Sequence, residues 1–160
     1  MRRTLPFFVF VVLAPAAVRA QDTKTPDPEP TPHISPALGV HYGTPLRFSA
    51  SAGVLVDMSE HRNDGVVATV EIGQQGNEIS AGYFRMLGRF GSGYSLRLAA
   101  VRTVGEPWNA SPNTTYAGVE GSWMIAFGVG ARVGFLRRTS KSHDFDPHPS
   151  LASLGVQIGI

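Results

Sequence analysis

The stretch SLGVQIGI, Ser153 to Ile160, has the alternation of a β-strand with two different faces. Side chains on a strand point alternately to opposite sides. One side of this stretch is wholly apolar and carries Leu154, Val156, Ile158 and Ile160. The other is small and polar and carries Ser153, Gly155, Gln157 and Gly159. Because an apolar strand face must lie against a protein core or lipid, the rest of the sequence has to show which of the two it meets.

The same period of two recurs along most of the chain. Clear alternation covers residues 46–58, 66–73, 94–101, 117–123 and 127–135. Residues 78–87 alternate less cleanly, because Arg85 shares a face with Ile79 and Tyr83, and residues 37–43 form a short first strand. With the last stretch this makes about eight strands, an even number that allows an antiparallel up-and-down barrel to close with both ends of its chain on one side.

The composition of the two faces favours a transmembrane barrel over a soluble one. A soluble barrel places lysine, glutamate and threonine on its outer face. The only two lysines, Lys24 and Lys141, fall outside the expected strands. A charged side chain facing lipid near the bilayer midplane costs about 2–4 kcal/mol, which accounts for this depletion. The alternative is a secreted soluble barrel that binds a hydrophobic ligand.

In a membrane barrel the small, polar face lines the lumen. The alternation places six charged residues on that face, where they can neutralise one another: Arg47, Asp57, Glu71, Arg97, Glu120 and Arg132. A hairpin centred on Ala126 would place Glu120 directly opposite Arg132. At the diameter of eight strands side chains fill the interior, so a structural plug is favoured over a polar passage.

The N-terminal region predicts export. Residues 1–20 combine Arg2 and Arg3 with a short apolar run and a small residue, Ala20, as in a secretory signal peptide. Cleavage there removes three arginines and no acidic residue, so the excess of 14 basic over 12 acidic residues disappears and no nucleic-acid partner is expected. Residues 21–36 are rich in proline and predict an extended linker, which leaves 37–160 as the barrel domain.

The sequence predicts no catalytic, cofactor or metal site. The segment HDFDPH, residues 143–148, resembles a set of metal ligands, but it lies in a proline-containing loop and lacks the spacing of a calcium loop. A lipid hydrolase embedded in the barrel is a third hypothesis, since some small outer-membrane barrels are lipid hydrolases. It would need a serine nucleophile beside a histidine base. The order Ser142–His143 does not match the His-x-Ser-Asn motif of the acyloxyacyl hydrolases, so we do not expect an enzyme.

With its signal, linker and alternating strands, the chain resembles the small OmpA/OmpX-like outer-membrane β-barrel family over residues 37–160. The resemblance implies a monomer in the bacterial outer membrane, in contact with its lipid, with a role in envelope integrity or surface interaction. It also implies insertion by the barrel-assembly machinery, whose last-strand signal is matched by Ser153, Gly155, Ile158 and Ile160. The chain departs from the family at Ile160, where that signal usually ends in phenylalanine or tryptophan.

Overall fold

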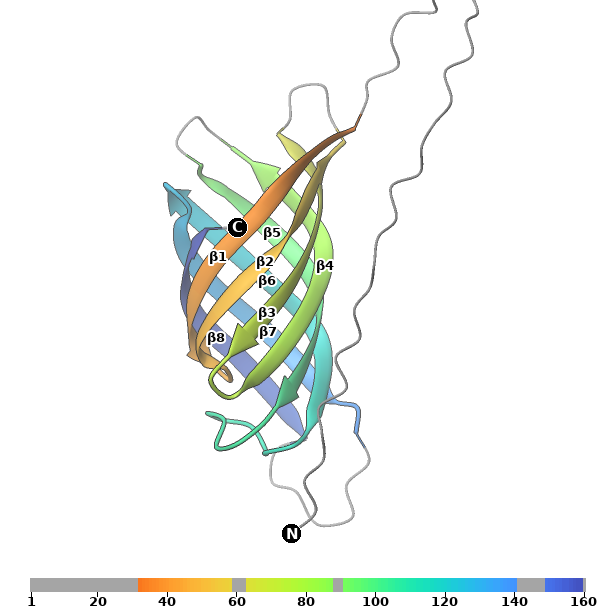
Figure 1. Ribbon diagram of the computed structural model, residues 1–160, viewed down its shortest axis with the longest axis vertical. Coiled ribbons are helices and arrows are strands. Elements are labelled where there is room, and N and C mark those ends of the chain that lie inside the picture. Colours follow the sequence, from red (N-terminus) through yellow and green to blue (C-terminus); the bar gives the residue numbers. More distant parts are fainter. Residues whose placement is uncertain (1–31, 59–62, 88–90, 141–148, 160) are drawn as a thin grey trace, which may run out of the picture.

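The computed structural model describes residues 32–58, 63–87, 91–140 and 149–159, which form one closed antiparallel barrel (Figure 1). Each strand pairs with its neighbours in sequence, and the last strand closes onto the first. This confirms the expected all-β, eight-stranded up-and-down barrel. The strands are β1 (His33–Thr44), β2 (Arg47–Asp57), β3 (Asp64–Gly73), β4 (Gly76–Met86), β5 (Gly93–Thr103), β6 (Thr115–Ala126), β7 (Val129–Arg138) and β8 (Ser150–Gly159).

The strands are strongly staggered around the barrel. A path that starts at Ile34 and follows directly paired residues through all eight strands returns to β1 at Thr44, ten positions further along. In a closed barrel such a stagger requires the strands to tilt against the axis, and this tilt is visible in Figure 1. The first half of β1 therefore pairs with β2 alone, because β8 pairs with β1 only from Gly39 onward.

Strand β1 begins at His33, four residues before the expected start at Ala37. The expected linker boundary at residue 36 thus lies inside the strand, where Pro36 pairs with Val54. Proline is tolerated at a sheet edge, and among the described residues β8 pairs with β1 only from Gly39 onward. The expected signal peptide and most of the expected linker lie outside the described residues.

The two ends of the barrel carry different connections. One end carries the β1–β2 and β3–β4 turns and segment 104–114, and β7 ends and β8 begins there; it is called the loop end below and is at the bottom of Figure 1. Strand β1 begins and β8 ends at the opposite, terminal end. Segment 104–114 folds over the neighbouring turns, since Glu106 N donates to Gln75 Oε1 at 2.8 Å and Arg47 Nη2 donates to Glu106 O at 3.1 Å.

The interior consists of a polar layer between two apolar clusters. The cluster toward the terminal end comprises Ala37, Leu55, Val67 and Phe84, with Met86 against it. The cluster toward the loop end comprises Leu46, Ala99, Val101, Ala110, Tyr116, Leu136 and Leu151. The expectation of a small, polar inner face therefore holds for the middle of the barrel only.

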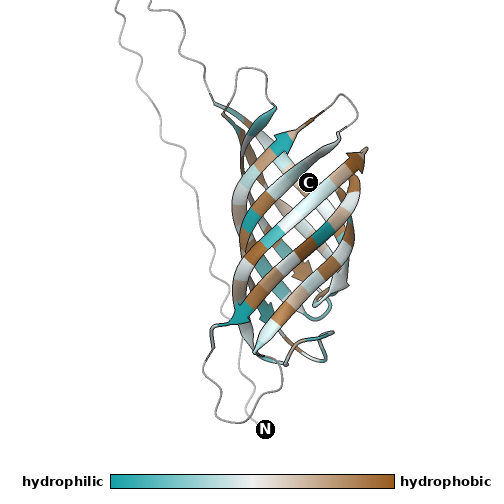
Figure 2. Cartoon of the chain, turned by 180° about the vertical axis from the view of Figure 1, so that it is seen from behind, coloured by the Kyte–Doolittle hydropathy of each residue, from teal (hydrophilic) through white to brown (hydrophobic). Residues whose placement is uncertain are grey.

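The outer face is apolar between the two ends, because the outward-facing residues there are hydrophobic or small. Hydrophobic residues recur along the strands in Figure 2. Exposed large apolar side chains occur on every strand, among them Val40, Val54, Val70, Ile79, Leu98, Val119, Val133 and Leu154. No helix long and apolar enough to cross a membrane occurs in the described parts of the chain.

Candidate functional site

The polar layer of the lumen is organised around Arg132 of β7. Its guanidinium lies 2.6 Å from Glu71 Oε2 and 2.6 Å from Glu120 Oε2, and it also forms an ion pair with Glu78. His41 Nδ1 lies 2.8 Å from the same oxygen of Glu71. All five residues are buried. Strands β1, β3, β4, β6 and β7 thus each contribute one side chain to a single charged cluster.

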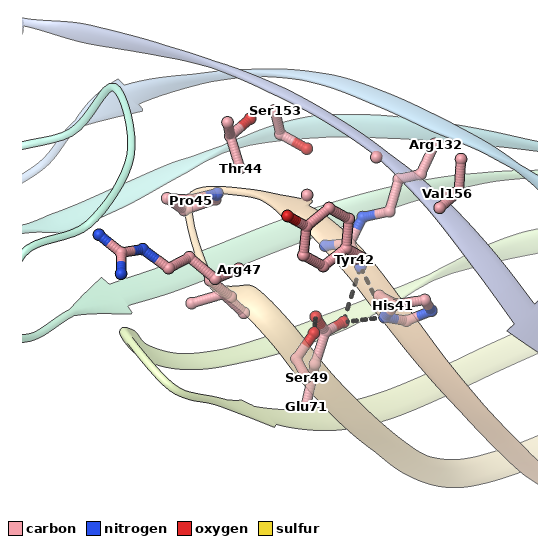
Figure 3. A pocket seen from close by; sticks show the side chains of 13 residues that line it. His41, Tyr42, Thr44, Pro45, Arg47, Ser49, Glu71, Arg132, Ser153 and Val156 are labelled. Carbon is pink, nitrogen blue, oxygen red and sulfur yellow. Dashed lines mark hydrogen bonds and ion pairs between the residues drawn. The ribbon is translucent and has the colours of Figure 1, made fainter.

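Short hydroxyl side chains make room for this cluster and hydrogen-bond to it. Ser49 Oγ donates to Glu71 Oε1 at 2.5 Å, and Ser153 Oγ donates to Glu120 Oε1 at 2.7 Å. Figure 3 shows His41, Ser49, Glu71 and Arg132 converging inside the barrel. Because buried charges need both ion pairs and hydrogen bonds to offset the loss of water, these serines are part of the cluster.

Charge within the layer is nearly balanced. Three carboxylates face two guanidiniums, those of Arg132 and Arg97. The imidazole of His41 is buried in the same layer. Arg97 enters from β5 and is 4% exposed, and its Nε has no hydrogen-bond partner among the described residues. The charged groups of the cluster neutralise one another, as a structural plug requires.

The structure brings together four of the six residues expected in the lumen network: Glu71, Arg97, Glu120 and Arg132. The other two lie at opposite ends of the barrel. Arg47 points away from Glu71 in Figure 3 and lies over the ring of Trp108 at 5.2 Å. Asp57 contacts His33 at the terminal end. The expected network was therefore wrong at Arg47 and Asp57, because alternation identifies the face of a residue but not its height along the barrel.

Glu120 and Arg132 meet in a different register from the one expected. The β6–β7 hairpin turns at Phe127 and Gly128, both with positive φ, and a bulge interrupts the pairing between Met124 and Ala126. Direct pairing therefore joins Glu120 to Gly134 and not to Arg132. The register differs from the expected one by two residues, which keeps both side chains inside. The long arginine side chain then reaches Glu120 diagonally.

Two members of the cluster were not expected in the network. Glu78 belongs to the strand whose alternation is disturbed by Arg85, and Arg85 lies outside near the end of β4. The inward position of Ser80, two residues after Glu78, was the signal that could have placed it. His41 of β1 faces the lumen, and nothing in the sequence pattern indicates its contact with Glu71.

The lumen contains little free space beside this cluster. The cavity that His41, Ser49, Glu71, Arg132 and Ser153 line together with neighbouring residues has a volume of about 20 Å³. Such a volume holds about one water molecule. Apolar clusters lie on either side of this cavity along the barrel axis.

A second group of polar residues, at the terminal end, resembles a catalytic triad in composition. His33 Nδ1 lies 3.2 Å from Asp57 Oδ2 and 3.0 Å from Ser35 Oγ. A triad needs the carboxylate and the hydroxyl on different ring nitrogens, so that one orients the imidazole and the other receives the proton. Here both contacts fall on Nδ1, so the group does not have the geometry of a nucleophilic site.

Some of the remaining predicted site residues lie in the described part of the chain. Ser153 faces the lumen and Ile158 faces outward, as the alternation of the last strand predicts, and Gly155 is half-buried. Ile160 and the segment 143–148 lie outside the described residues. Within the described part of the chain no group of three or more potential metal ligands occurs.

Comparison with known proteins adds no relative. A scan against protein-family models gave no match, and searches of the curated proteins and of the solved structures found no similar chain.

Proposed function

We propose that this chain is an integral protein of the bacterial outer membrane, of the small OmpA/OmpX-like kind, with a closed lumen and a structural or surface-binding role. The observation that carries the proposal is the distribution of charge. Ionised side chains gather inside the barrel and at its two ends, whereas the middle of the outer face is apolar. A protein surrounded by water has no physical reason for this arrangement.

The exposed side chains on the middle of the outer face are large. Ile79 is 61% exposed, Leu98 70% and Leu154 65%. Monomeric soluble proteins rarely expose continuous apolar patches of more than a few hundred Å². Among the described residues, outward-facing arginines occur only near strand ends: Arg85 toward the terminal end, and Arg102 and Arg137 toward the loop end. An apolar band between charged ends is typical of a barrel that spans lipid.

Aromatic side chains border this band on both sides. Tyr83 and Tyr94 pack against each other toward the terminal end, with ring centroids 6.4 Å apart. Tyr42 and Trp108 form an edge-to-face pair toward the loop end at 5.9 Å. Tyrosine and tryptophan are enriched at membrane–water interfaces, where the ring is apolar and its polar group reaches water.

The filled interior supports a closed barrel over a ligand carrier. A carrier of hydrophobic ligands needs an apolar cavity of a few hundred Å³. The lumen instead holds an ion cluster between two apolar plugs. With the lumen filled, the loop end is the part of the barrel that can bind a partner. If the expected signal peptide directs the termini to the periplasm, segment 104–114 at this end faces the exterior.

Fractionation and gel mobility test the proposal. We expect the expressed protein to stay in the outer membrane after washing with carbonate, to need detergent for extraction, and to migrate differently in boiled and unboiled samples. Release by carbonate, or refolding to a soluble monomer without detergent, would overturn the membrane assignment in favour of a secreted barrel.

A further inference from the structure

The outer face of the barrel has a shallow apolar depression over β4, β5 and β6. Its volume is about 570 Å³. Large side chains surround small ones there: Ile79, Leu98 and Val119 stand around Ala81, Ala100 and Ala117.

Two arginines lie beside this depression on its loop-end side. Arg102 follows Ala100 by two residues on the same face of β5, and Arg137 is the direct cross-strand partner of Ala117. Both side chains are exposed. Arg102 Nη1 donates to Thr115 Oγ1 at 3.1 Å, which holds its guanidinium beside the depression.

Neither arginine has an anionic partner in the described part of the chain. No carboxylate of the described residues lies within ion-pair distance of Arg102 or Arg137, whereas Arg132 in the lumen contacts three. Two unpaired guanidiniums at the edge of an apolar surface are complementary to a molecule with an anionic head and an apolar tail. Guanidinium groups suit phosphate well, since they can donate two parallel hydrogen bonds to its oxygens.

We propose that this face binds a phospholipid of the surrounding leaflet whose head group is anionic overall. One acyl chain lies in the depression on β4–β6, and the phosphate contacts Arg102 and Arg137. This inference rests on the proposed function, because a lipid reaches the site only if the outer face is in a membrane. It goes further by assigning one part of that face to a particular lipid chemistry.

Native mass spectrometry of the detergent-solubilised protein tests the proposal. The probes are phosphatidylglycerol and phosphatidylcholine with identical acyl chains, and inorganic phosphate alone. We expect phosphatidylglycerol to be retained at least tenfold better than phosphatidylcholine, and the double variant Arg102→Gln/Arg137→Gln to abolish this preference. Arg85→Gln, at an exposed arginine near the other end, is the matched control and should retain it.

A second pair of variants tests the acyl part of the site. Ala117→Phe fills the depression and should reduce phosphatidylglycerol retention at least fivefold, whereas Ala131→Phe, on the outer face of β7, should not. The proposal is overturned if the wild type retains both lipids equally, if the double variant keeps the preference, or if inorganic phosphate binds as well as the lipid.

The test separates this inference from the proposed function. A protein that remains heat-modifiable in micelles but shows no lipid preference loses the lipid site and keeps the membrane assignment. A protein that dissolves without detergent loses both.

Discussion

Arg132 is the residue on which the lumen depends most, because it faces three buried carboxylates at once. Removing one partner of a buried ion pair leaves uncompensated charge and costs about 3–5 kcal/mol. We predict that Arg132→Met lowers the free energy of unfolding by at least that amount. The measurement is a urea titration in detergent micelles, followed by the loss of the heat-modifiable form.

The control is Arg85→Met at an exposed position, which should change stability by no more than about 0.5 kcal/mol. Equal midpoints for the two variants would show that the carboxylates are not held by Arg132. The lumen would then resemble an ordinary water-filled interior more than a sealed charged layer.

Thr103 links the end of β5 to segment 104–114. Its fully buried hydroxyl donates to Ser111 O at 2.6 Å and accepts from Thr114 N at 3.1 Å. We predict that Thr103→Val destabilises the barrel by about 1–3 kcal/mol, since it removes the acceptor of the Thr114 N–H. It should also make segment 104–114 sensitive to limited proteolysis.

Thr115→Val serves as the comparison, because this half-buried residue begins the next strand. Its hydroxyl accepts a hydrogen bond from the exposed Arg102. Its proteolysis pattern should match the wild type. If the Thr103 variant also gave the wild-type pattern, other contacts, such as those of Gln75 with Glu106, would be sufficient to order the segment.

At the scale of the strands, the outer face gives a direct comparison between lipid and water. Val70 lies in the middle of β3 and faces outward, and Asn77 faces outward at the loop end of β4. We predict that Val70→Lys costs about 2–4 kcal/mol in micelles or liposomes, and that Asn77→Lys costs less than about 1 kcal/mol. Stability against urea is the readout. A soluble barrel would tolerate both lysines, so equal stability of the two variants would contradict a lipid-facing surface.

The strands themselves could be read from the sequence, since the period of two is set by the pleat and survives any detail of packing. The register of β6 on β7 could not, because it depends on the turn at Phe127–Gly128 and on a local bulge. Both act through backbone conformation, which a hydrophobic pattern does not record. The shift by two residues preserved the faces, so Glu120 and Arg132 met even though their expected pairing was wrong.

The composition of the lumen cluster was only partly predictable for a reason that belongs to the whole barrel. A stagger of ten residues sets which inward positions share one height, and no single strand contains this information. Arg47 and Asp57 were assigned by face alone and proved to lie at opposite ends. Glu78 lies at the height of the cluster. It was missed because the disturbed alternation of its strand left its face unassigned.

The whole molecule is closed along its axis by three consecutive layers, and this predicts that it conducts no ions. An ion would have to pass the cluster around Phe84, then the charged layer, then the cluster around Tyr116. We expect no stepwise conductance from wild-type protein in planar bilayers. Phe84→Ala should be silent as well, because it opens one layer and leaves two in place. Steps from the wild type would show that the lumen opens, and steps from Phe84→Ala alone would make that apolar cluster the only barrier.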